Sequence, residues 1–249
     1  MKADARYAVL AWAAEDTFER DPTDLSPGAD PRLGALGYTL LAHITAVDQL
    51  ASFGRQRVFY GFLAANDAEC ALVFRGTERA IEWAKDAEAA LVAHPITGHV
   101  HAGFWNIYDS ARLLTAAGTE EPLAAGVLEV AAGRHITVAG HSLGAPLATY
   151  AAYDLASMHP EQVAARLLAS PRPGDTAFSG AASAAIRDLA GYAYEKDLVP
   201  KVPFGGGYAP LSNLVEIPAN PAIPDNPGSW HHAQNYAWLL DPDSVPDPV

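Results

Sequence analysis

The segment from Arg134 to His159 constrains the fold of this chain more than any other. A β-branched and apolar run at residues 136–139 is followed by the motif GHSLG at residues 140–144 and then by an alanine-rich stretch. This order predicts a strand, a tight turn and a helix. A serine at the tip of such a turn is held in a strained conformation that exposes its hydroxyl, and the flanking glycines allow close packing. Ser142 is therefore the candidate nucleophile.

The rest of the chain alternates between the patterns of strands and helices. Helices are expected over residues 4–20, 33–51, 78–93 and 122–132, and residues 178–185 are helical or irregular. Residues 99–104 are expected to lead into a further helix that runs through about residue 116. Strands are expected over residues 57–65, 69–75, 164–169 and 191–194. This alternation predicts an α/β fold, with a mostly parallel central sheet covered by helices on both faces.

The length of 249 residues fits one domain over residues 1–249. Residues 200–227 hold seven prolines and three consecutive glycines, so we expect a long loop there. Long ordered loops in compact domains tend to border functional sites.

Composition excludes several classes of partner. A net charge of -13 argues against nucleic acid and against simple attraction to anionic membranes. No apolar run approaches the roughly 18 residues that a membrane span needs.

The single cysteine, Cys70, excludes an internal disulfide. No signal peptide follows Met1, so the expected location is cytoplasmic, or secreted if the sequence is a trimmed mature form.

A serine hydroxyl needs a base to activate it and a carboxylate to orient that base. The strand, Gly-x-Ser-x-Gly turn and helix are typical of α/β-hydrolases, in which the acid and the histidine follow the serine in sequence. Asp197 fits the acid because it comes just after a predicted strand, at the sheet edge where the serine turn opens; Asp225 is the alternative. His159 ends the serine's own helix, too far from the hydroxyl. His231 and His232 both remain as the base.

Further motifs resemble those of the class 3 lipases, the fungal triacylglycerol lipase-like branch of the α/β-hydrolases. The resemblance extends from about Val58 to Leu239, and the motifs occur in the order found in the family. They are FRGT at 74–77, VHAGF at 100–104, GHSLG at 140–144, SPRPGD at 170–175, DLVP at 197–200 and HHAQNY at 231–236.

The resemblance implies an α/β-hydrolase fold and an ester hydrolase that needs no cofactor and no metal. It assigns the nucleophile to Ser142, the acid to Asp197 and the base to His231, because the family histidine precedes an Asn-Tyr pair at this spacing. The backbone N–H of Leu143, directly after the nucleophile, is one expected oxyanion donor. The resemblance implies that Thr77 is the second donor.

Residues 78–93 correspond in the family to a lid over the site, and their plain alternative is an ordinary amphipathic helix. The candidates for lid or substrate contact are Ile81, Trp83 and His141. For His141 the competing interpretation is a residue that hydrogen-bonds the ends of the strands.

Two other groups of residues are expected to be structural. His99 and His101 have a spacing that could hold a metal, but no acidic or cysteine ligand accompanies them in sequence, so no metal site is predicted. Arg75 is expected to form a structural ion pair.

These features predict a serine hydrolase that acts on an acyl ester or lipid, including at a lipid–water interface. A lipase is the first hypothesis, and a short-chain or feruloyl-type esterase or a phospholipase A1 is the alternative. Transfer of the acyl group to an alcohol would use the same residues, and a catalytically silent binding module is the hypothesis from another class. The sequence indicates no oligomeric state.

Overall fold

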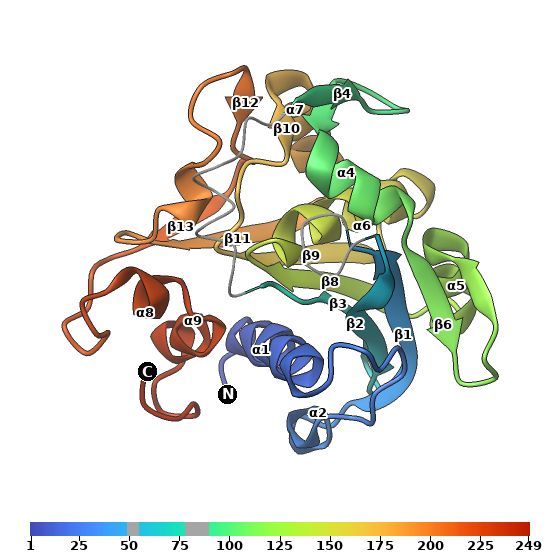
Figure 1. Cartoon of the computed structure of the whole chain (residues 1–249), viewed down its shortest axis with the longest axis horizontal. Coiled ribbons are helices and arrows are strands. Elements are labelled where there is room, and N and C mark those ends of the chain that lie inside the picture. The colour runs from blue at the N-terminus through green and yellow to red at the C-terminus, as the bar shows by residue number, and fades with distance from the viewer. Residues whose placement is uncertain (49–54, 78–89) are drawn as a thin grey trace.

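The computed structural model describes residues 1–48, 55–77 and 90–249, and a nine-stranded sheet runs through this part of the chain (Figure 1). In order across the sheet the strands are β13 (Leu214–Ile217), β11 (Asp188–Tyr194), β9 (Val163–Leu168), β8 (His135–His141), β3 (Glu69–Phe74), β2 (Arg57–Ala65), β1 (Thr39–Val47), β6 (Arg112–Thr115) and β7 (Glu120–Pro122). The five strands from β13 to β3 are parallel, and the other four extend the sheet in antiparallel pairs. The predicted mostly parallel sheet is confirmed.

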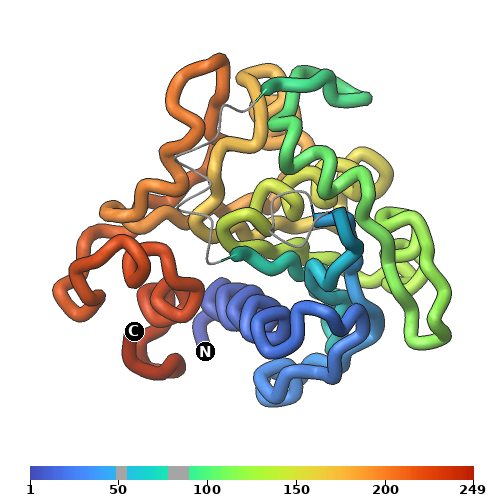
Figure 2. The backbone as a smooth tube through the Cα atoms, in the orientation of Figure 1, coloured from blue at the N-terminus to red at the C-terminus, as the bar shows by residue number. Residues whose placement is uncertain are grey.

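Helices cover both faces of this sheet, as predicted. On one face, α1 (Ala5–Arg20) and α9 (Ala233–Leu240) lie side by side (Figure 2). The other face packs against α4 (Ala102–Asp109), α5 (Leu123–Ala131), α6 (Gly144–Met158) and α7 (Thr176–Ala185). The short helices are α2 (Pro31–Ala35), α8 (Pro227–His231) and the 3-10 turn η1 (Val199–Lys201).

The central strands are apolar along their whole length because both of their faces are covered. Leu72 of β3 and Val138 of β8 belong to the core on the α6 side. Their sequence neighbours Val73 and Ala139 belong to the core on the α1 side. Side chains of a strand alternate between its faces, so a strand covered twice has no polar stripe.

A smaller sheet of four strands lies near α4 and α7 (Figure 1). Its strands, in order, are β12 (Tyr208–Ala209), β10 (Gly174–Asp175), β5 (His99–His101) and β4 (Leu91–Ala93). Within the three described ranges, no helix is both long enough and apolar enough to span a lipid bilayer.

The helix predicted over residues 33–51 is wrong. The chain forms the short helix α2, turns at Gly37 with a φ of 80° and continues as β1, while residues 49–54 lie outside the described residues. Ala42, Ile44 and Ala46 point into one core at every second position, which is the period of a strand. This period, together with the β-branched residues of β1, outweighs the apparent helical spacing.

Three other boundaries differ from the prediction. The helix expected to run through about residue 116 ends at Asp109, and β6 follows and pairs with β1. The predicted loop at 200–227 contains β12 and also β13, which pairs with β11. Of the lid helix expected over residues 78–93, residues 78–89 lie outside the described part, and residues 91–93 form β4 instead of a helix.

Candidate active site

Ser142 lies in the turn between β8 and α6 and has a φ of 52°, in the left-handed region that favours glycine. Its N–H donates a hydrogen bond of 2.9 Å to the carbonyl of Leu168, which holds the turn against β9. A Cβ atom on Gly140 would lie 2.3 Å from the carbonyl oxygen of Gly144, and one on Gly144 would lie 2.5 Å from that of Arg75. Only glycine allows strand and helix to approach this closely, which explains the motif.

His231 links Ser142 to Asp197, a residue that follows β11. His231 is the last residue of α8, at whose start the side chain of Asn226 accepts a hydrogen bond from the N–H of Ser229. His231 Nε2 lies 2.7 Å from Ser142 Oγ, and His231 Nδ1 lies 2.7 Å from Asp197 Oδ2. All three side chains are buried. A continuous hydrogen-bonded chain therefore joins carboxylate, imidazole and hydroxyl.

Asp197 is fixed by two further donors. The backbone N–H of Val199 donates to Asp197 Oδ1 at 2.9 Å, and the Tyr236 hydroxyl donates to Asp197 Oδ2 at 2.8 Å. The same hydroxyl accepts a hydrogen bond from the N–H of Tyr194. Burial and the adjacent carboxylate raise the pKa of Tyr236 well above its usual value, so the hydroxyl stays protonated and remains a donor.

Sequence periodicity does not predict the contact of Tyr236 with Asp197. The only local signal is its place at the end of the HHAQNY motif.

The alternative residues from the sequence lie elsewhere. His232 accepts the N–H of Gln234 and caps α9. Asp225 is an exposed carboxylate paired with Lys196. His159 is the exposed C-cap of α6. The geometry therefore brings Ser142, Asp197 and His231 together and leaves these three apart.

The two expected oxyanion donors belong to segments that adjoin these side chains. Leu143 is the N-cap of α6, a position where the backbone N–H has no partner within the helix. Thr77 follows β3 and lines one cavity together with His141 and His231.

His141 lies between the candidate base and α1. Its ring centroid is 4.8 Å from that of His231, and its Nδ1 lies 2.6 Å from Glu15 Oε1. Burial alone lowers the pKa of His141, but the charge and hydrogen bond of Glu15 outweigh burial and the pKa is raised. Burial likewise raises the pKa of Glu15, yet His141 brings the net pKa down. Both shifts favour an ion pair beneath the site.

Two of the three candidates for substrate contact, Ile81 and Trp83, lie outside the described residues. The two histidines of β5 have separate contacts. His99 Nδ1 lies 2.9 Å from Asp175 Oδ2, so an acidic residue distant in sequence lies beside it, while His101 caps α4. Among the described residues, no group of three or more His, Cys, Asp or Glu side chains could hold a metal ion.

The family of the chain follows from its match to known proteins. The family model described as Lipase (class 3) matches residues 71–206. The chain belongs to the class 3 lipase family. The resemblance found in the sequence motifs is thereby confirmed.

Within this family, two rice proteins are similar over long stretches. Phospholipase A1-II 3 of Oryza sativa subsp. indica is 30% identical, over 92% of this chain and 60% of the relative. The protein of the same name from Oryza sativa subsp. japonica is 30% identical, over 69% of this chain and 48% of the relative. The chain thus spans about half the length of these curated relatives.

A solved structure supports the fold of this family member. The lipase from Rhizopus microsporus var. chinensis superposes with a TM-score of 0.63 at 22% identity, covering 87% of this chain and 74% of that chain. The predicted α/β-hydrolase fold is confirmed.

Proposed function

We propose that this class 3 lipase-family chain is a serine hydrolase of carboxylic esters that acts on acyl lipids. The observation that carries the proposal is the hydrogen-bonded chain from Asp197 through His231 to Ser142. A fold hosts many functions, so the function is inferred from this geometry. A buried serine with a positive φ and an imidazole at 2.7 Å has the properties of an activated nucleophile.

In the proposed reaction, His231 Nε2 accepts the hydroxyl proton while Ser142 Oγ attacks the ester carbonyl carbon. The carbonyl electrons move onto oxygen, and the N–H groups of Leu143 and Thr77 stabilise that charge. When the intermediate collapses, the acyl C–O bond breaks and His231 gives its proton to the leaving alcohol. Asp197 accepts the Nδ1–H bond throughout and stabilises the imidazolium.

Water completes the proposed cycle. It attacks the acyl-serine carbonyl while His231 again accepts a proton, and collapse of the second intermediate releases the carboxylic acid. His231 returns the proton to Ser142 Oγ. No step requires a metal ion or an organic cofactor.

Phospholipids are the first lipid substrates to test, because the two rice relatives carry the name phospholipase A1. Triacylglycerols are the second, because the family is described as lipases. Short-chain and feruloyl esters would use the same residues and differ only in how the acyl group is bound.

The test compares initial rates on p-nitrophenyl esters from acetate to palmitate, and on phospholipid and triacylglycerol emulsions. Ser142→Ala and His231→Ala should each lose at least about a thousandfold in kcat. His232→Ala is the matched control and should stay active. The optimum of chain length then separates lipase from esterase.

Two outcomes would replace the proposal. If the unmodified protein hydrolysed none of these esters and were not covalently labelled by an organophosphonate, the silent binding module would be favoured. Ester products in the presence of an alcohol, without free acid, would favour acyl transfer.

A further inference from the structure

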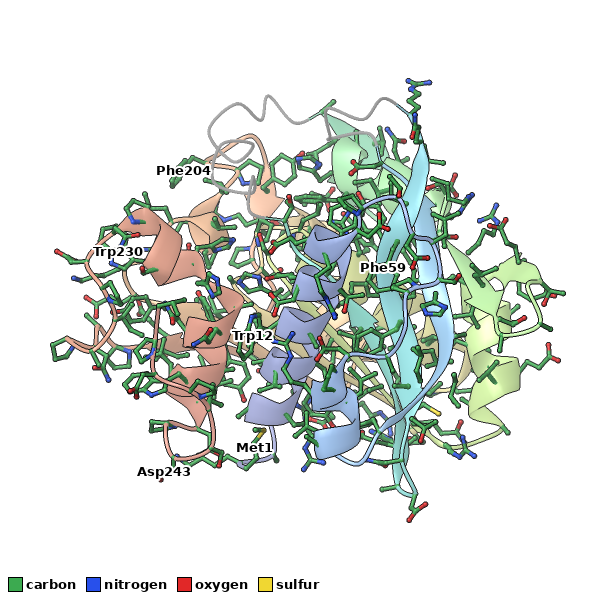
Figure 3. The ribbon with its side chains drawn as sticks, turned by 60° about the horizontal axis from the view of Figure 1, so that its bottom comes forward. Met1, Trp12, Phe59, Phe204, Trp230 and Asp243 are labelled. Carbon is green, nitrogen blue, oxygen red and sulfur yellow. The ribbon has the colours of Figure 1, made fainter. Side chains whose placement is uncertain are left out.

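Arg75 is the largest side chain among those fully buried in the described structure, with 1% of its surface exposed. Its guanidinium carbon lies 3.5 Å from the ring centroid of Phe18 and 4.4 Å from that of Tyr60, so two rings enclose the charge. Its Nε donates to the carbonyl of Phe59, labelled in Figure 3 beside α1, at 2.8 Å. Burying a cation costs free energy unless polar partners compensate for its lost hydration. The other hydrogen bonds of the guanidinium therefore show what stabilises its charge.

The structural ion pair expected for Arg75 is long. Arg75 Nη2 lies 3.8 Å from Asp48 Oδ2, beyond normal hydrogen-bonding distance. Arg75 Nη1 instead donates to the carbonyl oxygen of Gly76 at 2.8 Å. The short bonds of the guanidinium are thus to backbone carbonyls of β2 and of its own turn.

The Gly76 carbonyl belongs to the peptide unit that also contains the N–H of Thr77. This peptide is not among the cis bonds of the chain, so its C=O and N–H point in opposite directions. A cation bound to the oxygen fixes the plane of the unit and draws electron density toward that oxygen. The N–H on the other side therefore becomes a stronger donor.

The preceding peptide unit is held as well. The N–H of Gly76 donates to Glu15 Oε1 at 3.0 Å, and the same oxygen contacts His141 at 2.6 Å. A Cβ atom on Gly76 would lie 2.3 Å from Glu15 Oε1. The turn after β3 is therefore anchored to the buried guanidinium of Arg75 through one peptide and to the half-buried carboxylate of Glu15 through the other.

We propose that Arg75 is a positioning residue that orients and polarises the Gly76–Thr77 peptide as an oxyanion donor. This inference rests on the proposed function, because it assigns the strengthened N–H to the developing charge of the tetrahedral intermediate. A fixed dipole aimed at that charge needs no reorganisation during the reaction. Arg75 contributes without touching the substrate.

The test uses Arg75→Lys, which keeps a charge but cannot bond both carbonyls with the same geometry. Arg57→Lys is the matched control, because Arg57 also donates to two backbone carbonyls, of Thr45 and Ser110. Asp48→Asn is a second control, which removes the long ion pair and leaves the carbonyl bonds. We expect kcat to fall about 10- to 100-fold in Arg75→Lys with KM nearly unchanged, and neither control to change kcat.

A second measurement separates this role from a merely structural one. Each variant is assayed on an ester and on its thionoester, in which sulfur replaces the carbonyl oxygen and is a weaker acceptor. The ratio of the two kcat/KM values is independent of the fraction of folded protein. We expect the ratio of kcat/KM for the ester to kcat/KM for the thionoester to fall in Arg75→Lys and to stay constant in both controls.

If Arg75→Lys left both kcat and this ratio unchanged, the inference would be overturned. It would also be overturned if Arg75→Lys lowered kcat/KM by the same factor on the ester and on the thionoester. If Arg75→Lys fails to fold, Arg75→Gln is assayed in the same way. The proposed function fails separately, when the normal chain shows no ester hydrolysis or when Ser142→Ala remains active.

Discussion

The two sides of the candidate site are built in opposite ways. On the base side, Asp197, His231 and Ser142 form a chain of single hydrogen bonds between groups that can gain or lose a proton. On the oxyanion side, the turn at Gly76 is hydrogen-bonded to two charged groups, the buried guanidinium of Arg75 and the half-buried carboxylate of Glu15. The first arrangement suits the transfer of a proton, and the second restrains a peptide dipole.

This difference follows from what each side would do in the proposed reaction. A base must change charge during every turnover, so its partners have to accept both forms. An oxyanion donor works best when it does not move, so strong charge-assisted bonds around it are an advantage. The following experiments test whether the two sides respond differently.

The largest effect is expected from Asp197→Asn on the base side. The amide can donate to His231 Nδ1 and so favour the wrong tautomer, which should lower kcat by about 10⁴. Asp225→Asn, at an exposed carboxylate paired with Lys196, is the control and should leave kcat unchanged. Steady-state rates on one ester suffice, and an active Asp197→Asn enzyme would break the proposed roles.

On the oxyanion side, Gly76→Ala should lower kcat about 10- to 100-fold. The new Cβ would displace Glu15 Oε1 and loosen the turn that carries Thr77. Gly180→Ala in α7 meets no atom within 4 Å and should be neutral or slightly stabilising. Equal kcat in both variants would show that the turn tolerates movement.

Tyr236→Phe tests how far the support of Asp197 matters on the base side. Loss of the hydroxyl leaves Asp197 with one donor fewer, and we expect kcat to fall about tenfold and stability to fall by about 1–2 kcal/mol. Tyr150→Phe also removes a buried hydroxyl, one that donates to the carbonyl of Pro173. This control should lose similar stability in urea unfolding with kcat intact; a parallel loss of kcat would remove the special role of Tyr236.

The smallest effect concerns the Glu15–His141 pair and its pH dependence. The lowered pKa of Glu15 stabilises the fold above the ordinary carboxyl value of 4.5, and this stability is lost as pH falls through the folded pKa. The raised pKa of His141 stabilises it below the ordinary value of 6.5, and this stability is lost as pH rises through the folded pKa.

Glu15→Gln should therefore lower stability most between about pH 4.5 and 6.5, by about 2 kcal/mol, and progressively less toward pH 9. Urea unfolding at pH 5.5 and pH 9 measures the difference. Glu129→Gln, at an exposed position of α5, should show no such trend. A difference that stays constant with pH would mean that the two residues do not form an ion pair.

Sequence patterns were most informative where the chemistry is local. The strand, turn and helix around Ser142 lie within one continuous segment, and the steric need for Gly140 and Gly144 appears directly in the motif. The place of Asp197 at the sheet edge beside the serine turn could be predicted because the residue follows a strand. The choice between His231 and His232 depended on the family spacing, since adjacent residues at the junction of α8 and α9 have no distinguishing period.

The same patterns failed where a contact joins distant segments. Glu15 lies 126 residues from His141, and nothing in the amphipathic pattern of α1 marks one of its acidic residues as a partner. The role of Tyr236 depends on the position of its hydroxyl between β11 and Asp197, which periodicity cannot give. β1 was mistaken for a helix because its apolar residues fit both periods.

The pairing of α1 with α9 on one face of the sheet has a consequence for biosynthesis. On the ribosome, α1, β3 and the serine turn emerge well before α8 and α9. The nascent chain can build the parallel strands and the nucleophile while it still lacks His231 and Tyr236. The proposed nucleophile would therefore lack its proposed base until α8 and α9 are made and α9 docks beside α1, so that ester hydrolysis would begin only after these helices have been translated.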